Sequence, residues 1–254
     1  MRTVILAAGR GSRLHPLTTG IPKALVPLVG VPLLDRLLTA LAAAGVEGPV
    51  TAVTGYRGQQ ISRPGLRNLP YPAWDHTTMV GSLLAATDDL TAGDDVLVLY
   101  GDIVVEHRVL TATLDGDTAW DVVVPVNTAW HALWSARMSD PLADVECLRL
   151  GPAARITEIG GCPATVEEVQ AQFMGIIRFS PAAARGLVRF ADAADAAATG
   201  WDTTTLLAHW IAAGQAVHAV AVDGGWLEID TINDHQLYQR LAANGQLDRY
   251  CVLS

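Results

Sequence analysis

Short apolar runs alternate with amphipathic stretches along most of the chain. Apolar runs of about four to eight residues bounded by glycine or polar residues are typical of buried strands. Strands are therefore expected at 3–6, 50–54, 96–100, 121–126, 172–179, 217–222 and 226–229. Apolar residues spaced three and four apart predict helices at 32–44, at 79–86, from 180–181 onward, from 202 to 214, and in a final segment that ends near 244–245.

Several of the expected helices carry signals at their ends. Pro32 suits the first turn of a helix, and Gly45 suits the position just beyond its end. Ser180 and Asp202 each fit the start of a later helix, because their side-chain oxygens can accept hydrogen bonds from free backbone N–H groups. Strands alternating with helices indicate an α/β, Rossmann-like fold with a mainly parallel (mixed) sheet and flanking helices. Ligands of such folds bind beyond the carboxyl ends of the strands.

Size and composition restrict the class of protein. The chain has 254 residues, half of them hydrophobic, which suits a single domain over residues 1–254. No apolar run approaches the roughly 18 residues of a membrane span, and the apolar stretch near Met1 is too short for a signal peptide. The net charge of -9 argues against nucleic acid as a partner. The three cysteines have neither zinc-site spacing nor a disulfide pattern, so a cytoplasmic location is expected.

The basic residues are almost all arginine. There are 16 arginines and one lysine, Lys23. A GC-rich genome accounts for the scarcity of lysine, but it does not account for the place of the one that is present. Lys23 lies in a Pro-Lys pair, ten residues after Arg13.

A glycine-rich loop directly follows the first expected strand. Residues 6–13 read Leu-Ala-Ala-Gly-Arg-Gly-Ser-Arg, and residues 22–28 read Pro-Lys-Ala-Leu-Val-Pro-Leu. Glycines at a strand end let backbone N–H groups approach phosphate oxygens closely. Arg13 can bind a phosphate group with its planar fork, and Lys23 offers a compact charge. The alternative is an ordinary strand-to-helix turn with solvated basic residues.

These two motifs together resemble the nucleotidyltransferase superfamily that includes the sugar-1-phosphate nucleotidyltransferases. Four later segments resemble its phosphocholine and phosphonate cytidylyltransferase branch, so that the resemblance covers nearly the whole chain. They are Tyr-Gly-Asp-Ile-Val at 100–104, Trp130-x-x-x-Trp134-x-x-Arg137, Gln-Phe-Met-Gly at 172–175 and Trp-Leu-Glu-Ile-Asp at 226–230.

The resemblance implies a fold of the nucleotide-diphospho-sugar transferase type, with a nucleotide-binding part at about 1–126 and an acceptor-binding part at about 127–254. It implies catalytic roles for Arg13 and Lys23. The implied nucleotide contacts are Leu6, Ala7, Ala8, Gly9, Gly11, Ser12, Thr78, Ser82 and Gly101. The branch often has asparagine where Thr78 stands. The other interpretation of Thr78 and its neighbour Thr77 is that they cap the start of a helix.

Asp102 and Asp230 are expected to bind Mg²⁺. Each closes an apolar run, so both can lie at the same edge of the sheet. Mg²⁺ prefers one or two carboxylates together with phosphate oxygens and water. Taken singly, either aspartate fits a turn or a helix cap better than a metal site, and the resemblance at both positions reverses this preference. Glu228 fits a supporting role beside the metal or a plain polar position in a strand.

The implied acceptor contacts are Trp130, Trp134, Arg137, Asp144, Glu146, Gln172 and Gly175. Two tryptophans can enclose a quaternary ammonium group through cation–π contacts, and acidic side chains would add attraction. The tryptophans can equally belong to the core. His131, Arg137 and Arg178 would instead suit an acidic phosphonate, so both kinds of acceptor remain open.

The predicted reaction is transfer of CMP from CTP to a small phosphonate or phosphocholine-like acceptor, with Mg²⁺ and release of pyrophosphate, in phosphonate natural-product biosynthesis. A sugar-1-phosphate nucleotidyltransferase is the nearest alternative, but the second signature lysine of those enzymes is absent. An inactive nucleotide-sensing subunit would have no need of Arg13, Lys23, Asp102 and Asp230. The first loop lacks the Gly-x-Gly-x-x-Gly spacing of dinucleotide oxidoreductases. The chain is expected to be a monomer or a homodimer.

Overall fold

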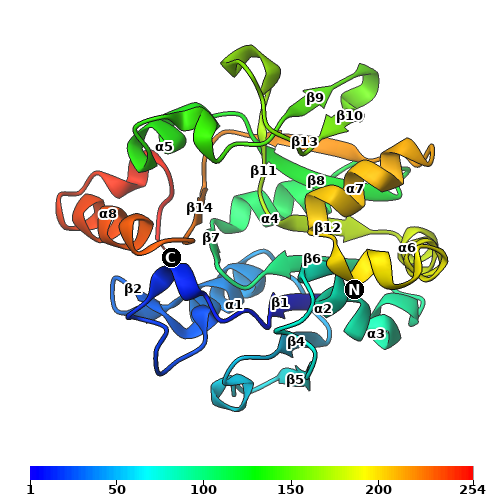
Figure 1. The fold of residues 1–254 in the computed structure, drawn as a ribbon, viewed down its shortest axis with the longest axis horizontal. Helices are drawn as coiled ribbons and strands as arrows, with labels where there is room; N and C mark the ends of the chain where they lie inside the picture. Colours follow the sequence, from blue (N-terminus) through cyan, green and yellow to red (C-terminus); the bar gives the residue numbers. More distant parts are fainter. Residues whose placement is uncertain (254) are drawn as a thin grey trace.

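The computed structural model describes residues 1–253, without the side chains at 195 and 196. Its centre is an eight-stranded mixed sheet between layers of helices (Figure 1). Seven strands follow the order β11 (Gln172–Phe173), β8 (Val122–Asn127), β12 (Ile176–Phe179), β6 (Val96–Tyr100), β1 (Arg2–Ala7), β4 (Val50–Thr54) and β5 (Leu66–Pro70). The eighth, β13 (His218–Val222), pairs with the side of β8 away from β12.

Six strands of the main sheet run in one direction, and β11 and β12 run in the opposite direction. β6, β1, β4 and β5 are mutually parallel, and β13 is parallel to β8. β12 is antiparallel to both β6 and β8, and β11 is antiparallel to β8. Since β12 separates β6 from β8, these two strands run in the same direction. The expected α/β fold with a mainly parallel, mixed sheet is therefore confirmed.

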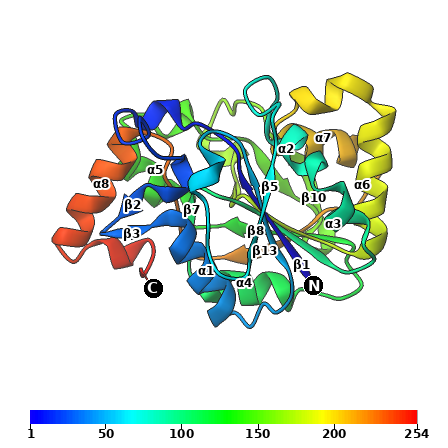
Figure 2. The same ribbon diagram turned by 90° about the horizontal axis from the view of Figure 1, so that it is seen from below.

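Alternation along the strands gives the sheet two apolar faces. In β1, Ile5 and Ala7 join one core while Val4 and Leu6 join the other. The first core receives α1 (Leu33–Ala43), α4 (His107–Leu114), α5 (Trp130–Arg137) and α8 (Ile232–Ala243). The second receives α2 (Met79–Ala85), α3 (Thr87–Thr91), α6 (Pro181–Ala193) and α7 (Thr203–Ala212), on the opposite side in Figure 2. No helix within residues 1–253 is long and apolar enough to cross a membrane.

Three two-stranded sheets complete the fold. β14 (Trp226–Glu228) pairs antiparallel with β7 (Ile103–Val105). The other two join β2 (Pro27–Leu28) to β3 (Val31–Pro32), and β9 (Leu148–Leu150) to β10 (Ile156–Ile159). The β7–β14 pair has a direct consequence for chemistry, because it brings the residue before β7 close to the residues after β14.

The helix signals and most strand positions are confirmed, with one clear error. Ser180 accepts a hydrogen bond from the Ala183 N–H at 3.1 Å, and Asp202 accepts one from the Thr205 N–H at 2.7 Å, as expected of N-caps. The single strand expected at 172–179 is wrong, because it divides into β11 and β12. Gly175 between them has φ +69°, a conformation incompatible with a continuous strand.

Candidate active site

The glycine-rich loop begins at the carboxyl end of β1, in the centre of the sheet. The Leu6 carbonyl accepts the Gly101 N–H at 2.9 Å, and the Ala8 carbonyl accepts the Tyr56 N–H at 3.0 Å, so both sides of the loop are tied to neighbouring strands. Leu6, Ala7 and Ala8 are buried, whereas Gly9 and Ser12 are exposed. A Cβ at Gly9 would meet no atom within 4 Å, so an incoming group can approach the backbone there.

Gly11 is shaped to receive the side chain of Lys23. Gly11 adopts the left-handed conformation, with φ +68°. A Cβ on this residue would lie 2.9 Å from Lys23 Cβ and 3.0 Å from Lys23 Cγ. The aliphatic stem of Lys23 therefore packs directly on the loop, which aims the ammonium group across the end of the sheet.

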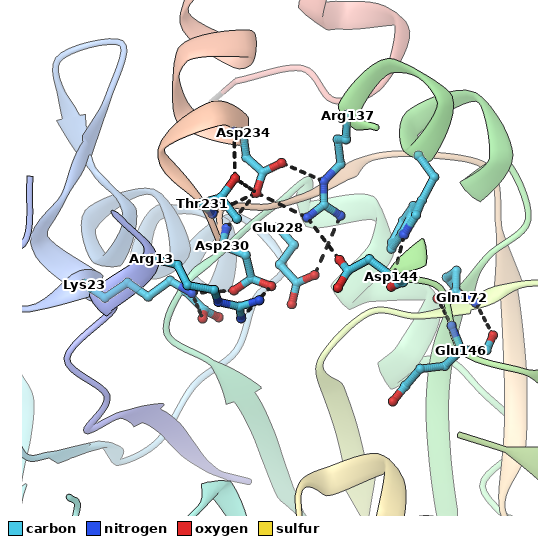
Figure 3. A network of polar contacts seen from close by, with 12 residues as sticks. Arg13, Lys23, Arg137, Asp144, Glu146, Gln172, Glu228, Asp230, Thr231 and Asp234 are labelled. Atoms are coloured by element: carbon cyan, nitrogen blue, oxygen red, sulfur yellow. Dashed lines mark hydrogen bonds and ion pairs between the residues drawn. The ribbon is translucent and has the colours of Figure 1, made fainter. Parts of the chain in front are cut away.

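The Lys23 ammonium lies between two carboxylates, and Figure 3 shows it close to Asp230 and Arg13. Nζ is 2.5 Å from Asp102 Oδ2 and 2.7 Å from Asp230 Oδ1. Arg13 Nη2 lies 3.3 Å from Asp230 Oδ2, and its side chain is largely exposed. Asp102 follows β6, and Asp230 follows β14, which pairs with β7 next to Asp102. All four residues predicted for catalysis and metal binding thus come together from four separate segments.

Burial and neighbouring charges together set the pKa values of this cluster. Burial alone would lower the pKa of Lys23, but the carboxylates of Asp102 and Asp230 outweigh burial and raise it. Burial works against ionisation of Asp230, yet Lys23 and Arg13 hold the pKa of its carboxyl below the ordinary value. Burial, with the carboxylates of Asp230 and Asp102 nearby, raises the pKa of Glu228 to about 8.

The donor set at this point suits a magnesium–phosphate complex. Asp102 Oδ1 is buried and has no hydrogen-bond partner, so one carboxylate oxygen remains available. Within residues 1–253 no three His, Cys, Asp or Glu side chains form a metal-binding group. Two carboxylates are nonetheless enough for Mg²⁺ when phosphate oxygens and water complete its coordination. Glu228 stands beside them, which fits the supporting role left open by the sequence.

Two adjoining cavities open beside the cluster. The smaller, of about 90 Å³, is lined by nucleotide-side residues that include Leu6, Gly9, Lys23 and Asp102. The larger, of about 470 Å³, is lined by Arg13, Met79, Tyr100, Trp134, Ala143, Asp144, Val145, Glu146, Gly161, Cys162, Gln172, Phe173, Gly175, Asp202, Thr204, Glu228 and Asp230. Met79 and Tyr100 line both, so the two cavities share part of their wall.

Of the seven predicted acceptor contacts, five line the larger cavity: Trp134, Asp144, Glu146, Gln172 and Gly175. Trp130 does not; its Nε1–H donates to the Val169 carbonyl at 3.1 Å, although both tryptophans belong to the core and are 3% exposed. Arg137 is also absent from the lining, because its side chain is fully buried against Asp234 behind the wall. The core interpretation thus describes Trp130, whereas Trp134 reaches the cavity.

Gln172 and Gly175 fix neighbouring residues of the cavity wall. Gln172 donates to the Glu146 carbonyl at 2.7 Å and accepts the Glu146 N–H at 3.4 Å, which fixes Glu146 in the wall. A Cβ at Gly175 would lie 2.6 Å from the Tyr100 ring, so glycine permits the close contact between them. Burial raises the pKa of the Glu146 carboxyl, and a hydrogen bond from Thr204 opposes this increase.

Two residues predicted to contact the nucleotide, Thr78 and Ser82, lie outside the lining of the site. Thr78 donates its backbone N–H to the Thr199 carbonyl at 3.0 Å, and its hydroxyl bonds the carbonyls of Thr199 and Trp201. Ser82 is buried in α2. Neither residue lines the two cavities of the site. Thr78 therefore connects α2 to the 199–201 segment in this structure.

The cations considered for an acidic acceptor lie elsewhere. Arg178 is buried and donates to the carbonyls of Leu114 and Asp117, and His131 is exposed with its ring edge-on to Trp130. Among the described residues that line the larger cavity, Arg13 alone is a lysine or arginine. A separate cavity of about 510 Å³ near Trp210 and His218 contains none of the predicted site residues.

Sequence reasoning missed several residues of the wall. Tyr100, Phe173, Asp202 and Thr204 line the cavity, and Asp202 was expected only as a helix cap. The sequence predicted that Asp202 begins a helix, but it did not predict that this helix borders the cavity. Asp234, which binds Arg137, also carried no sequence signal beyond its place near the start of the last helix.

Known proteins resemble the chain over most of its length. The sequence profile of the MobA-like NTP transferase domain matches residues 3–158. The CTP:phosphoglutamine cytidylyltransferase of Campylobacter jejuni is 28% identical over 251 residues, which cover 92% of this chain and 97% of that protein.

Two solved structures share the fold. CTP:phosphocholine cytidylyltransferase from Streptococcus pneumoniae has a TM-score of 0.71 at 18% identity, covering 95% of this chain and 98% of its own. The inositol-1-phosphate CTP transferase from T. maritima has a TM-score of 0.73 at 16% identity, covering 99% and 97%. These likenesses confirm the expected fold of the nucleotide-diphospho-sugar transferase type.

Proposed function

Because the chain belongs to the family of MobA-like NTP transferase domains, it is a nucleotidyltransferase, and we propose that it transfers CMP from CTP to a small phosphorylated or phosphonate acceptor. One observation carries the proposal. Lys23 and Arg13 meet the carboxylates of Asp102 and Asp230 beside an open glycine-rich loop, at the carboxyl edge of the sheet. This arrangement offers positive charge for a triphosphate and carboxylates for its magnesium ion.

The chemistry needs little from a general base. A phosphate or phosphonate oxygen of the acceptor is already ionised near neutral pH and attacks the α-phosphorus in line. A bond forms between this oxygen and the α-phosphorus, the bond to the bridging oxygen breaks, and pyrophosphate leaves. Lys23 and Arg13 would stabilise the charge that gathers on the phosphoryl oxygens. Asp102 and Asp230 would hold Mg²⁺, which neutralises phosphate charge when bound.

The choice of CTP rests on relatives rather than on a base contact. The Campylobacter jejuni protein that matches almost end to end is named for CTP. No hydrogen bond in the described residues identifies a cytosine-binding group, and the Thr78 hydroxyl already bonds to protein carbonyls. Base preference is therefore the part of the proposal that most needs direct measurement.

The charge of the larger cavity favours an acceptor with a cationic head. Asp144, Glu146 and Asp202 line it together with the aromatic residues Tyr100, Trp134 and Phe173. Carboxylates and aromatic rings both attract an ammonium or trimethylammonium group. An acidic head would meet these carboxylates, because Arg178 is buried elsewhere and Arg137 lies behind the wall, 3.9 Å from both Asp144 and Glu228. We therefore favour an amine-bearing phosphonate or phosphate ester over a carboxylate-bearing acceptor.

A pyrophosphate-release screen tests the proposal. Four nucleoside triphosphates would be combined with aminoalkyl phosphonates, phosphocholine, acidic phosphonates and sugar 1-phosphates, with and without Mg²⁺. We expect turnover with CTP and a cationic acceptor only when Mg²⁺ is present. Turnover of glucose 1-phosphate with UTP or dTTP, while CTP and the small acceptors are inert, would instead identify a sugar-nucleotide enzyme. Binding of CTP without any turnover would indicate a nucleotide-sensing subunit.

A further inference from the structure

The Asp234 carboxylate is surrounded by donors from three residues. Its side chain is 3% exposed and lies in the first turn of α8. Oδ1 accepts Arg137 Nε–H at 3.0 Å. Oδ2 accepts Arg137 Nη2–H at 3.3 Å, the Thr231 N–H at 2.8 Å and the Thr231 hydroxyl at 2.9 Å. It also accepts the backbone N–H of Asp230 at 3.2 Å.

Helix capping explains only part of this arrangement. Thr231 and Asp234 form a capping box, which satisfies the first free N–H groups of α8. The Asp230 N–H lies one residue before the cap, outside the helix. A cap also needs no buried guanidinium, yet the Arg137 side chain is completely buried against Asp234. The additional contacts therefore hold Asp230 itself.

The position of Asp230 is what the cluster depends on. Its carboxylate reaches Lys23 Nζ at 2.7 Å with one oxygen and Arg13 Nη2 at 3.3 Å with the other. A shift of its backbone by about 1 Å would break one of these contacts. Figure 3 shows Asp234 between Arg137 and Thr231, above Asp230 in this view.

We propose that Asp234 and Arg137 are positioning residues that hold Asp230 where its carboxylate meets Lys23, Arg13 and the magnesium–nucleotide complex. This inference rests on the proposed function. Asp234 holds the Asp230 backbone, and Arg137 keeps Asp234 in place with two hydrogen bonds and a compensating charge. Arg137, which the sequence assigned to the acceptor, acts here behind the acceptor wall.

The test combines activity with a binding measurement. The first readout is the Mg²⁺ concentration that gives half-maximal pyrophosphate release. The second is the rise in Tm that Mg²⁺ and CTP together cause. Changing a residue that supports a metal ligand typically costs about 10–100-fold in metal affinity or activity. We expect Asp234→Ala to raise the Mg²⁺ requirement by about this factor and to abolish most of the ligand-dependent rise in Tm.

Conservative variants keep the test decisive if Asp234→Ala fails to fold. Asp234→Asn retains an oxygen that can accept the Asp230 N–H but loses the ion pair, and Arg137→Lys retains the charge but loses the fork. Both should raise the Mg²⁺ requirement several-fold. The matched control is Ser180→Ala, which removes the N-cap of α6. It should lower Tm and leave the Mg²⁺ requirement within about twofold of wild type, because N-cap loss acts on helix stability.

The outcomes separate the two proposals. If Asp234→Asn and Arg137→Lys keep the wild-type Mg²⁺ requirement and ligand-dependent rise in Tm, the residues are merely structural and the positioning role is wrong, even where Tm itself falls. If the wild-type protein shows neither pyrophosphate release nor a rise in Tm with Mg²⁺ and any triphosphate, the proposed function fails, and the positioning role fails with it.

Discussion

The nucleotide side and the acceptor side of the site differ in how their charges are balanced. On the nucleotide side, three ion pairs of 2.5 to 3.3 Å join two cations and two carboxylates. On the acceptor side, Asp144, Glu146 and Asp202 line a cavity whose one lining cation among the described residues is Arg13, while Arg137 is buried behind the wall, 3.0 Å from Asp234 and 3.9 Å from Asp144. The first side is nearly neutral and can receive a metal and a phosphate together. The second carries excess negative charge that a cationic ligand would neutralise.

The difference also lies in what builds each side. A glycine-rich loop and two strand ends form the nucleotide side, so backbone geometry fixes most of it. The acceptor side is assembled from side chains on α5, β11, α7 and the segment around residue 145. Substitution can therefore change acceptor preference without disturbing the reacting centre.

The largest expected effect is at Lys23. Lys23→Ala should lower turnover by about 10²–10³-fold, because it removes one preorganised charge beside the reacting phosphate. Lys23→Arg should also be poor, since a planar fork cannot take the place of a compact ammonium between two carboxylates. Pyrophosphate release measures turnover, and circular dichroism checks that the variants are folded. Near-normal turnover by Lys23→Ala would remove the basis for calling this side the reacting centre.

The two carboxylates should come next. Asp102→Asn and Asp230→Asn should each reduce turnover by about tenfold or more and raise the Mg²⁺ concentration needed, because each removes an anionic metal ligand. Metal titrations of both variants against wild type would measure this. Chelation of divalent ions should abolish wild-type activity. Full activity in the presence of a chelator would mean that Asp102 and Asp230 serve only as partners of Lys23.

A smaller effect, limited to the acceptor, is expected at Asp144 and Trp134. Asp144→Asn and Trp134→Leu should each raise KM for a trimethylammonium or amine acceptor by about threefold to thirtyfold, the range expected for a lost cation–π or ion-pair contact. KM for CTP should stay nearly unchanged. Steady-state kinetics with both substrates measures the two constants. A lower KM for the cationic acceptor in Asp144→Asn would show that the cavity prefers an anionic head.

The smallest effect on activity is expected at Trp130. Trp130→Phe should leave kcat/KM for the acceptor within about twofold, because Trp130 lies in the core and not in the cavity. It should lower the free energy of unfolding by about 1–3 kcal/mol, since the variant loses the hydrogen bond to Val169 and some buried volume. Urea denaturation measures the stability change. A large rise in acceptor KM would place Trp130 in the acceptor site after all.

Local signals account for the parts that the sequence predicted correctly. The loop at 6–13, Lys23 and the two strand-end aspartates combine local pattern with the rule that parallel strands end at one edge. β6 and β1 obey this rule, so Asp102 lies next to the loop. The antiparallel β7–β14 pair then adds Asp230. The sequence predicted Asp230 at this edge only because it closes an apolar run.

The acceptor side was predicted less completely because its residues meet through tertiary packing. Trp130 and Trp134 are four residues apart on α5 and both are buried in the core, yet only Trp134 also lines the cavity. The spacing of Arg137 in the same motif suggested an acceptor contact, but packing of α5 against α8 turns it to Asp234. The break at Gly175 depends on its contact with Tyr100, which no local pattern reveals.

The close contact between Gly11 and Lys23 has an evolutionary consequence. The space of a single methyl group at position 11 is already filled by the lysine stem. A substitution of Gly11 would displace the Lys23 ammonium without removing its charge. The effect of a change at either position therefore depends on the residue at the other. These two residues, 12 positions apart in the chain, form one heritable unit. Loss of the lysine stem would remove the steric limit at position 11, although the φ of +68° would still favour glycine there.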